Sequence, residues 1–351
     1  MDSIKKSSPY EAGGARFDGP EDLAGGMVMK SEVYDQSVCI MNSVAYRYYI
    51  ERQNIAEISQ DLRVSKSTVS RLLKRAVNEG VVEFLIAEPF AACIELEKKL
   101  AKRYGLKSVS VVPVRGPESR QSAEPTKKRV ALEGARYLQR IVKDGDMLGF
   151  TWGGTMYYLI QYLNPCRKVN ANVITLHGSI AACDEKLSVK SLVRRAAMAF
   201  GGKHFSLSAD GLAESREQYL KTVGDAECRR ILSMLKYVNV SVSGTGAFYP
   251  NVDSLLASSG YLKPQEMKEL IERGVCCDFL LRFINRDGEE CESSLKDRTL
   301  SIALDTYRKI PCKILVASGS RKAHAVCSLL KGHLVTTLII DSYLAEALSK
   351  M

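Results

Sequence analysis

Residues 55–80, IAEISQDLRVSKSTVSRLLKRAVNEG, contain two amphipathic helical patterns that are separated by a short polar turn and end at a glycine. Two short helices joined by a tight turn, each with an apolar side, are typical of a helix-turn-helix. The apolar residues recur at helical spacing in both patterns: Ile55, Ile58 and Leu62 in the first, and Val69, Leu72, Leu73 and Val77 in the second.

The second pattern carries the residue types that a recognition helix presents to double-stranded DNA. It has no acidic residue, and Ser65 stands where the N-cap is expected. Short hydroxyl side chains and long cations both bind phosphates or base edges. A surface helix with a solvated cationic side is the plainer alternative, but the preceding helix and the turn fit a helix-turn-helix as well. We therefore predict an operator-binding helix whose DNA-binding residues are Ser65, Lys66, Ser67, Thr68, Ser70, Arg71, Lys74 and Arg75.

Neighbouring segments extend this unit to residues 36–90. Residues 38–49, VCIMNSVAYRYY, are expected to form a leading helix that completes a three-helix core. Gly80 suits a helix C-cap, and residues 81–86, VVEFLI, are expected to form one strand of a wing. Residues 1–35 hold two Gly-Gly pairs, two prolines and few branched apolar residues, so a disordered leader is expected there.

Composition favours a polyanionic partner and gives no sign of a metal site. The 351 residues include 50 Lys and Arg against 40 Asp and Glu, so the net charge is +10. The ten cysteines form no CxxC pair and no Cys/His cluster with zinc spacing, so no metal and no cofactor are expected. Neither a secretory signal nor a long apolar stretch is present, which favours a cytoplasmic protein with no membrane partner.

Helical and strand patterns alternate from residue 91 to the end, which predicts an α/β domain with a mostly parallel, Rossmann-like sheet. A polar linker with two prolines is expected at 115–125. Strands are expected at 108–114, 147–150, 173–176, 204–207, 237–243, 277–283, 299–303, 313–317 and 335–340. Helices are expected at 91–104, 126–142, 155–163, 188–200, 214–222, 226–234, 264–273, 320–330 and 341–348. The predicted domains are thus 36–90 and 91–351.

Small, glycine-containing loops follow several of the expected strands. In residues 149–160, GFTWGGTMYYLI, Gly153 and Gly154 allow backbone amides to approach an anion, and Thr155 adds a hydroxyl at a helix N-terminus. A plain strand-to-helix turn is the alternative for this loop alone. Similar turns at 177–179, 243–246 and 317–320 would lie at the same edge of a parallel sheet, which indicates one shared pocket.

Residues 37–350 resemble the SorC family of bacterial sugar-binding transcriptional regulators. The likeness rests on AYRYYIERQNIAEISQDLRVSKSTVSRLLKRAVNEGVVEFLI, on Trp152 to Thr155, on Gly244 to Gly246, on GYLKPQEMKELIERG and on VASGSRKAHAVCSLLKGHLVTTLIID. The resemblance implies an effector domain related to sugar-phosphate isomerases and deaminases. It further implies a homo-oligomer (a dimer or, more usually, a tetramer) whose effector is a phosphorylated sugar or a related metabolite.

The resemblance also implies which residues bind the effector. The phosphate loop would consist of Gly153, Gly154 and Thr155, with Gly178 and Thr245 on neighbouring loops. Asp278 matches a carboxylate that receives effector hydroxyls, and Lys322 matches a lysine that meets phosphate or an adjacent oxygen. A carboxylate accepts from hydroxyl groups while an ammonium neutralises phosphate, so this pair is chemically suited to a sugar phosphate.

Two functions other than an effector-controlled regulator are alternatives for this sequence. A sugar-phosphate isomerase or deaminase would need a general base, for which Asp278 and His177 are the candidates, but it has no need of a helix-turn-helix. An architectural DNA binder would use residues 91–351 only to oligomerise. We expect a regulator and not an enzyme, in which effector binding shifts the arrangement of the subunits and so the spacing of the recognition helices on the operator.

Overall fold

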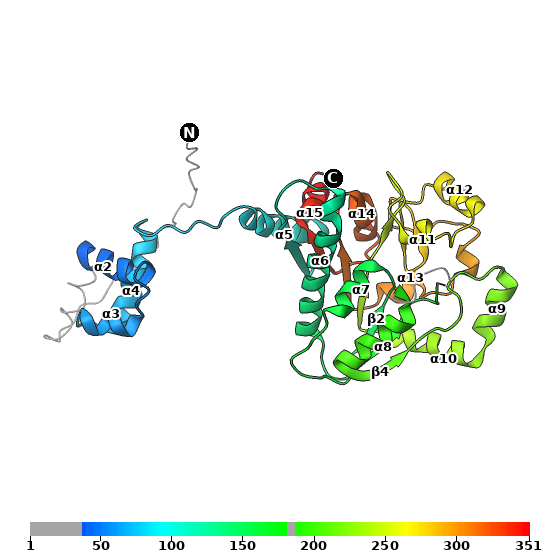
Figure 1. Cartoon of the computed structure of the whole chain (residues 1–351), viewed down its shortest axis with the longest axis horizontal. Helices are drawn as coiled ribbons and strands as arrows, with labels where there is room; N and C mark the ends of the chain where they lie inside the picture. Colours follow the sequence, from blue (N-terminus) through cyan, green and yellow to red (C-terminus); the bar gives the residue numbers. More distant parts are fainter. Residues whose placement is uncertain (1–36, 181–186) are drawn as a thin grey trace, which may run out of the picture. The chain divides into compact units, whose positions relative to one another are not determined.

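The computed structural model describes residues 37–180 and 187–351, so the leader expected at 1–35 lies outside the described residues. The chain divides between Leu85 and Ile86 into two compact units (Figure 1). Among the described residues, no helix is both long enough and apolar enough to cross a membrane.

The first unit contains the three predicted helices. They are α2 (Val38–Tyr49), α3 (Ile55–Asp61) and α4 (Lys66–Asn78). Asn54 and Glu57 form a capping box at the start of α3, which fixes the entry into the helix-turn-helix. One small core joins the three helices, and its buried members are Met41, Val44, Ala45, Ile58, Val69, Leu72, Leu73 and Ala76. The prediction of a helix-turn-helix is therefore confirmed.

The predicted wing is wrong for the described residues, because 81–88 form no strand. A strand needs a partner for its backbone groups, and this segment instead turns back on the helices. The Val82 amide donates to the Ala76 carbonyl at 3.1 Å, and the Phe84 ring packs against Tyr49 with 5.6 Å between ring centroids. Leu85 and Ile86 remain largely exposed.

The second unit is built on a seven-stranded sheet in which every neighbouring pair is parallel. Its order is β1-β10-β9-β5-β2-β3-β4. Long apolar runs such as residues 314–317 suit strands that are covered on both faces. The strands are β1 (Ser108–Val112), β2 (Met147–Phe150), β3 (Ala171–Thr175), β4 (Gly201–Phe205), β5 (Val240–Ser243), β9 (Cys312–Ala317) and β10 (Thr337–Asp341). The predicted Rossmann-like sheet is confirmed.

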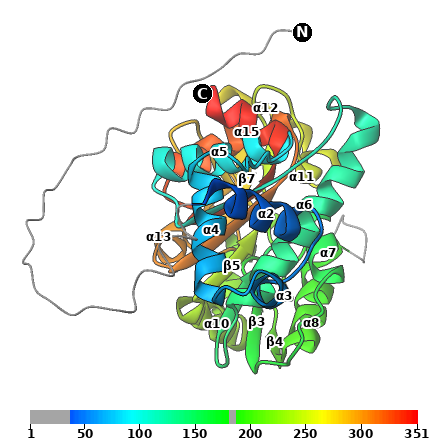
Figure 2. The same ribbon diagram turned by 90° about the vertical axis from the view of Figure 1, so that its left-hand side faces the viewer.

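Helices cover both faces of this sheet, and alternate strand residues belong to the two cores. Ile314 and Val316 pack with residues of α6 (Arg120–Ile141), α7 (Gly154–Gln161) and α8 (Val189–Phe200). Figure 2 shows these three helices on one side of the second unit. Leu315 and Ala317 pack on the other face, with α5 (Phe90–Tyr104), α10 (Ala226–Met234), α14 (Ala323–Lys331) and α15 (Ser342–Ser349). The remaining helices are α9 (Arg216–Gly224), α11 (Leu255–Ser258), α12 (Pro264–Glu272) and α13 (Leu304–Arg308).

Three predicted elements differ from the structure. Helix α6 begins at Arg120, inside the expected linker, because Ser119 and Ser122 form a capping box that starts it before Pro125. The expected strand 277–283 is a hairpin of β7 (Cys277–Phe279) and β8 (Arg282–Ile284), and β7 also pairs with β6 (Gly246–Ala247). The expected strand 299–303 makes only isolated bridges, to Leu212 and His177.

Candidate functional site

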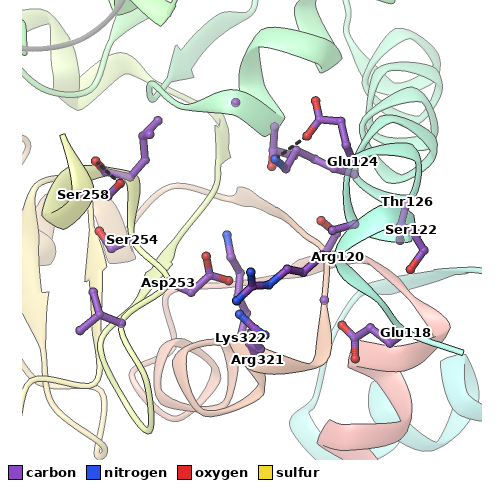
Figure 3. Close-up of a pocket in the computed structure, with 18 of the residues that line it drawn as sticks. Glu118, Arg120, Ser122, Glu124, Thr126, Asp253, Ser254, Ser258, Arg321 and Lys322 are labelled. Carbon is purple, nitrogen blue, oxygen red and sulfur yellow. Dashed lines mark hydrogen bonds and ion pairs between the residues drawn. The ribbon is translucent and has the colours of Figure 1, made fainter.

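A cavity of about 1050 Å³ opens beside the carboxyl ends of β1, β2, β9 and β10. From β2 the chain adds β3 and β4 on one side of the sheet, and from β5 it adds β9 and β10 on the other side. The neighbouring strands β2 and β5 therefore mark a topological switch point. Ligands of open α/β sheets bind in the crevice at such a point. The wall comes from the first turns of α6 and α7, from residues 252–258, from the loop 318–322 and from Tyr343 (Figure 3).

The loop after β2 leaves backbone amides at the cavity. Gly153 is the N-cap of α7, with φ at +117°, and no side chain of residues 37–180 or 187–351 caps that helix. The first amides of α7 therefore keep their capacity to donate to an anion, and the helix dipole favours negative charge there. Gly154 and Thr155 line the cavity. Lys127 lies beside them, since a Cβ built on Gly154 would be 3.9 Å from its Nζ.

Lys127 belongs to a small network on the same wall. Its Nζ donates to Glu124 Oε2 at 2.9 Å, and the Tyr158 hydroxyl donates to the other carboxylate oxygen. The hydrogen bond from Tyr158, followed by Lys127, lowers the pKa of Glu124. The same bond raises the pKa of Tyr158 to about 12. The carboxylate therefore stays ionised and holds both partners at the mouth of the α7 loop.

A second network joins Lys322 to the hairpin β7–β8. The Lys322 Nζ donates to the Thr245 carbonyl at 2.8 Å, and the Thr245 hydroxyl donates to the Asp278 carbonyl at 2.9 Å. The Ser254 hydroxyl donates to Asp278 Oδ1 at 2.6 Å. Burial raises the pKa of Asp278, while Ser254 and the charge of Lys322 lower it. Burial likewise lowers the pKa of Lys322, and the carboxylates Asp253 and Asp278 oppose that shift.

The structure brings most of the predicted effector residues together, but they do not all face the cavity. Gly154, Thr155 and Lys322 line it, and Gly153 starts the α7 loop. Thr245 and Asp278 lie one layer deeper, behind Lys322 and Ser254. Gly178 packs elsewhere: a Cβ there would lie 2.7 Å from the Ala209 carbonyl oxygen, so the glycine serves a close backbone approach.

Sequence reasoning missed the charged residues that dominate the wall. Asp253, just before α11, is the carboxylate that faces Lys322 and Arg120 in Figure 3. Residues 115–125 were predicted to be a linker, so the cavity residues in the first turns of α6 were not identified. The spacing of Ser119 and Ser122 is a helix-capping signal that could have indicated this start. The missed cavity residues with charged side chains are Glu118, Arg120, Glu124, Lys127, Asp253 and Arg321.

His177, considered above as a catalytic base, is fully buried and holds the β2 loop in place. Its Nδ1 pairs with the Gly178 carbonyl at 2.7 Å, which makes Nδ1 the protonated nitrogen, and its Nε2 accepts from the Trp152 amide at 3.2 Å. Burial lowers the pKa of His177 from 6.5 to about 4. It is therefore neutral near pH 7 and is absent from the cavity wall.

This burial predicts a pH dependence of stability. Between pH 6.5 and about 4, His177 is protonated in the unfolded chain but neutral in the folded chain. The free energy of unfolding is therefore highest above pH 6.5 and decreases as the pH falls through this interval. The contribution is about 3 kcal/mol. Urea unfolding at pH 7 and pH 4 should show that His177→Gln loses about 3 kcal/mol less than the wild type over this interval. Equal losses would contradict the assignment.

In the first unit, α4 and its N-cap leave all but one of the predicted DNA-binding residues at least partly exposed. Lys66, Ser67, Arg71 and Lys74 are exposed, while Ser70 and Arg75 are partly exposed. Ser65 is the N-cap and accepts from the Thr68 amide at 3.1 Å. These positions are compatible with a helix laid in the major groove.

Thr68 differs from the prediction, because only 3% of its surface is exposed. Its hydroxyl pairs with the Ser65 hydroxyl at 2.9 Å and accepts from Arg71 at 3.4 Å. Thr68 therefore shapes the first turn of α4 and orients Arg71, and its side chain does not reach outward.

Comparison with known proteins matches this architecture. Residues 88–349 match the family described as "Putative sugar-binding domain". The deoxyribonucleoside regulator of Bacillus subtilis (strain 168) is 30% identical over 301 residues, which cover 86% of this chain and 94% of that protein. The sorbitol operon regulator of Klebsiella pneumoniae is 25% identical over 320 residues, which cover 88% and 96%.

The same fold is present in a solved structure. The crystal structure of the full-length sorbitol operon regulator SorC from Klebsiella pneumoniae has a TM-score of 0.69 at 22% identity, and the match covers 90% of this chain and 99% of that one. Both relatives are named as regulators, so the prediction of a regulator rather than an enzyme is confirmed. This chain belongs to the SorC family of sugar-binding transcriptional regulators.

Proposed function

We propose that this protein binds operator DNA through α4 and that a phosphorylated sugar in the cavity of the second unit controls that binding. The observation that carries the proposal is the cavity itself. Its wall carries uncapped helix amides together with lysine and arginine side chains, and it also offers carboxylate and hydroxyl groups. Such a combination of donors and acceptors suits a ligand with one anionic end and several hydroxyl groups.

The phosphate end would bind where the α7 amides meet Lys127. Backbone amides and a cation at a helix N-terminus form a site for phosphate oxygens. Lys322 adds a second positive charge, and its Nζ is already fixed by the Thr245 carbonyl at 2.8 Å. An ammonium held in place loses little side-chain entropy when the ligand arrives.

The hydroxyl end would bind near α11. Asp253, Ser254 and Ser258 line that side of the cavity, and Asp253 has an exposed carboxylate that accepts hydrogen bonds from a polyol. Asp278 would act from behind by fixing the Ser254 hydroxyl. The names of the two relatives refer to a deoxyribonucleoside and to sorbitol, which supports a pentose- or hexitol-type effector for this chain.

Control of DNA binding would require that two or four copies of the chain assemble. A dimer spaces two recognition helices to match half-sites about one helical turn, or a multiple of it, apart. Effector binding would then change this spacing, with a coupling free energy of about 1–3 kcal/mol. We expect the protein to carry out this function in the cytoplasm.

A thermal-shift screen tests the effector half of the proposal. A ligand that binds only the folded chain raises the midpoint of unfolding, by about 2.7 kcal/mol of stability at 100 times its dissociation constant. Pentose, hexose and hexitol phosphates should include at least one compound that raises the midpoint at millimolar concentration, while its unphosphorylated parent should have a smaller effect. If none of them shifts the midpoint, the effector proposal fails.

A further inference from the structure

We infer that Glu118 acts as a built-in anion in the cavity, and that a phosphate group of the ligand displaces it from the loop 318–322. The inference deepens the proposed function, on which it rests. It assigns a second anion-binding site, at the loop 318–322, within the same cavity. In the absence of ligand, the Glu118 carboxylate of the protein occupies this site.

The Glu118 carboxylate occupies the loop after β9. Its Oε1 accepts from the Ser320 amide at 2.9 Å, and its Oε2 accepts from the Ser320 hydroxyl. Gly319 has φ at +93°, and a Cβ at this position would lie 3.4 Å from Glu118 Oε1, so the glycine lets the carboxylate approach the backbone. These two groups, an amide and a hydroxyl, are donors that phosphate oxygens also use.

Three cationic side chains line the same cavity as this loop. Arg120, Arg321 and Lys322 line the cavity together with Glu118 and Gly319, as Figure 3 shows for the charged residues. These three positive side chains favour an anion in the cavity. A phosphate brings more negative charge and more acceptor oxygens than the single carboxylate that it would replace.

The loop 318–322 is fixed by hydrogen bonds to the start of α15, whereas the Glu118 side chain is exposed to solvent. The Gly319 amide donates to Asp341 Oδ2 at 2.7 Å, and Asp341 Oδ1 accepts from the Leu344 amide at 3.1 Å, which locks the loop to the fully buried start of α15. Glu118 is exposed, so its carboxylate regains hydration when it leaves. Removing Glu118 would therefore leave the donors of the loop in place for a ligand.

Displacing Glu118 would also move a segment that reaches α5. Residues 115–118 are tied down at two further points: the Tyr343 hydroxyl donates to the Gly116 carbonyl at 2.7 Å, and the Arg115 guanidinium lies 5.8 Å from the centre of the Phe90 ring. Phe90 is the first residue of α5, which follows the division of the chain after Leu85. The segment thus links cavity occupancy to the stretch of chain that leads to the DNA-binding unit.

Calorimetric titration with inorganic phosphate tests the inference on the full chain. Glu118→Gln removes the charge but keeps an oxygen that accepts from Ser320, so the fold is retained. We expect phosphate to bind Glu118→Gln at least about 10-fold more tightly than the wild type, because no anion has to be displaced. The matched control is Glu133→Gln, on the helix α6 that follows Glu118; Glu133 pairs with Arg140 away from the cavity, and the phosphate affinity of this variant should equal that of the wild type.

Hydrogen exchange supplies the second measurement. Saturating phosphate should speed exchange of the Val114 and Ser119 amides in the wild type, because these bonded amides flank the segment that Glu118 anchors, and should leave them unchanged in Glu118→Gln. Equal or weaker phosphate binding by Glu118→Gln overturns the inference, as does exchange of the Val114 and Ser119 amides that phosphate does not alter in the wild type.

The outcome is separable from that of the proposed function. If sugar phosphates bind and depend on Lys322 while Glu118→Gln behaves as the wild type, the displacement of Glu118 fails and the effector proposal stands. If Glu118→Gln tightens phosphate binding but no sugar phosphate binds either protein, the loop is an anion site and the effector proposal fails.

Discussion

The double variant Lys66→Ala, Arg71→Ala is expected to bind operator DNA at least about 100-fold more weakly than the wild type, with effector binding intact. Both side chains are exposed on α4, at its first turn and one turn later. A lost base contact weakens binding by about 1–3 kcal/mol, and a lost phosphate contact also lowers the salt dependence. Fluorescence anisotropy with labelled operator DNA at several salt concentrations measures both effects.

The matched control removes the same charge from another exposed helix. Lys98→Ala, Lys99→Ala changes two exposed lysines of α5 and should keep operator affinity within about twofold of the wild type, since general charge contributes little compared with direct contacts. If the α4 double variant also stayed within twofold, the assignment of α4 as the recognition helix would be wrong.

Lys322→Ala is expected to weaken binding of a sugar phosphate by at least about 100-fold and to remove its effect on operator affinity. The ammonium is held by the Thr245 carbonyl and feels the charges of Asp253 and Asp278, so its loss removes a fixed positive charge that the phosphate would meet in the cavity. Truncating one partner of a buried, hydrogen-bonded charge pair costs about 2–5 kcal/mol of binding free energy. Calorimetry gives the affinity, and operator binding without effector should not change.

A second variant tests whether loss of any lysine from the second unit weakens sugar-phosphate binding. Lys190→Ala removes an exposed lysine from α8, outside the cavity wall, and should leave sugar-phosphate affinity unaltered. If Lys322→Ala kept wild-type affinity for the effector while melting cooperatively, Lys322 would have only a structural role.

The sequence was most informative where one periodicity covered a whole element. The apolar spacing of α4 and the buried run of β9 predicted both elements to within a residue or two, because burial of a continuous face determines them. The wing at 81–86 was predicted from β-branched residues alone. Propensity cannot show whether a partner strand exists, and in the described residues that segment has none.

The sequence predicted the glycine-containing loop of the cavity but not most of the charged residues that line it. The glycines and Thr155 stand at a strand-to-helix turn whose place in a parallel sheet follows from topology, so Gly154 and Thr155 could be assigned to the cavity. Asp253 and Glu118 could not, because they come from segments whose position depends on tertiary packing. Asp278 and Thr68 show the same effect in reverse: their residue types suggested ligand contacts, but the fold turns both side chains inward.

Operator affinity with and without the sugar phosphate found by thermal shift is the most direct test that the cavity and α4 act together. The account predicts that saturating effector changes the dissociation constant of the wild type for operator DNA by about 5- to 150-fold, in either direction, and that Lys322→Ala shows no such change. If the effector bound the wild type tightly while operator affinity stayed the same, the cavity would not control DNA binding and the central claim would be wrong.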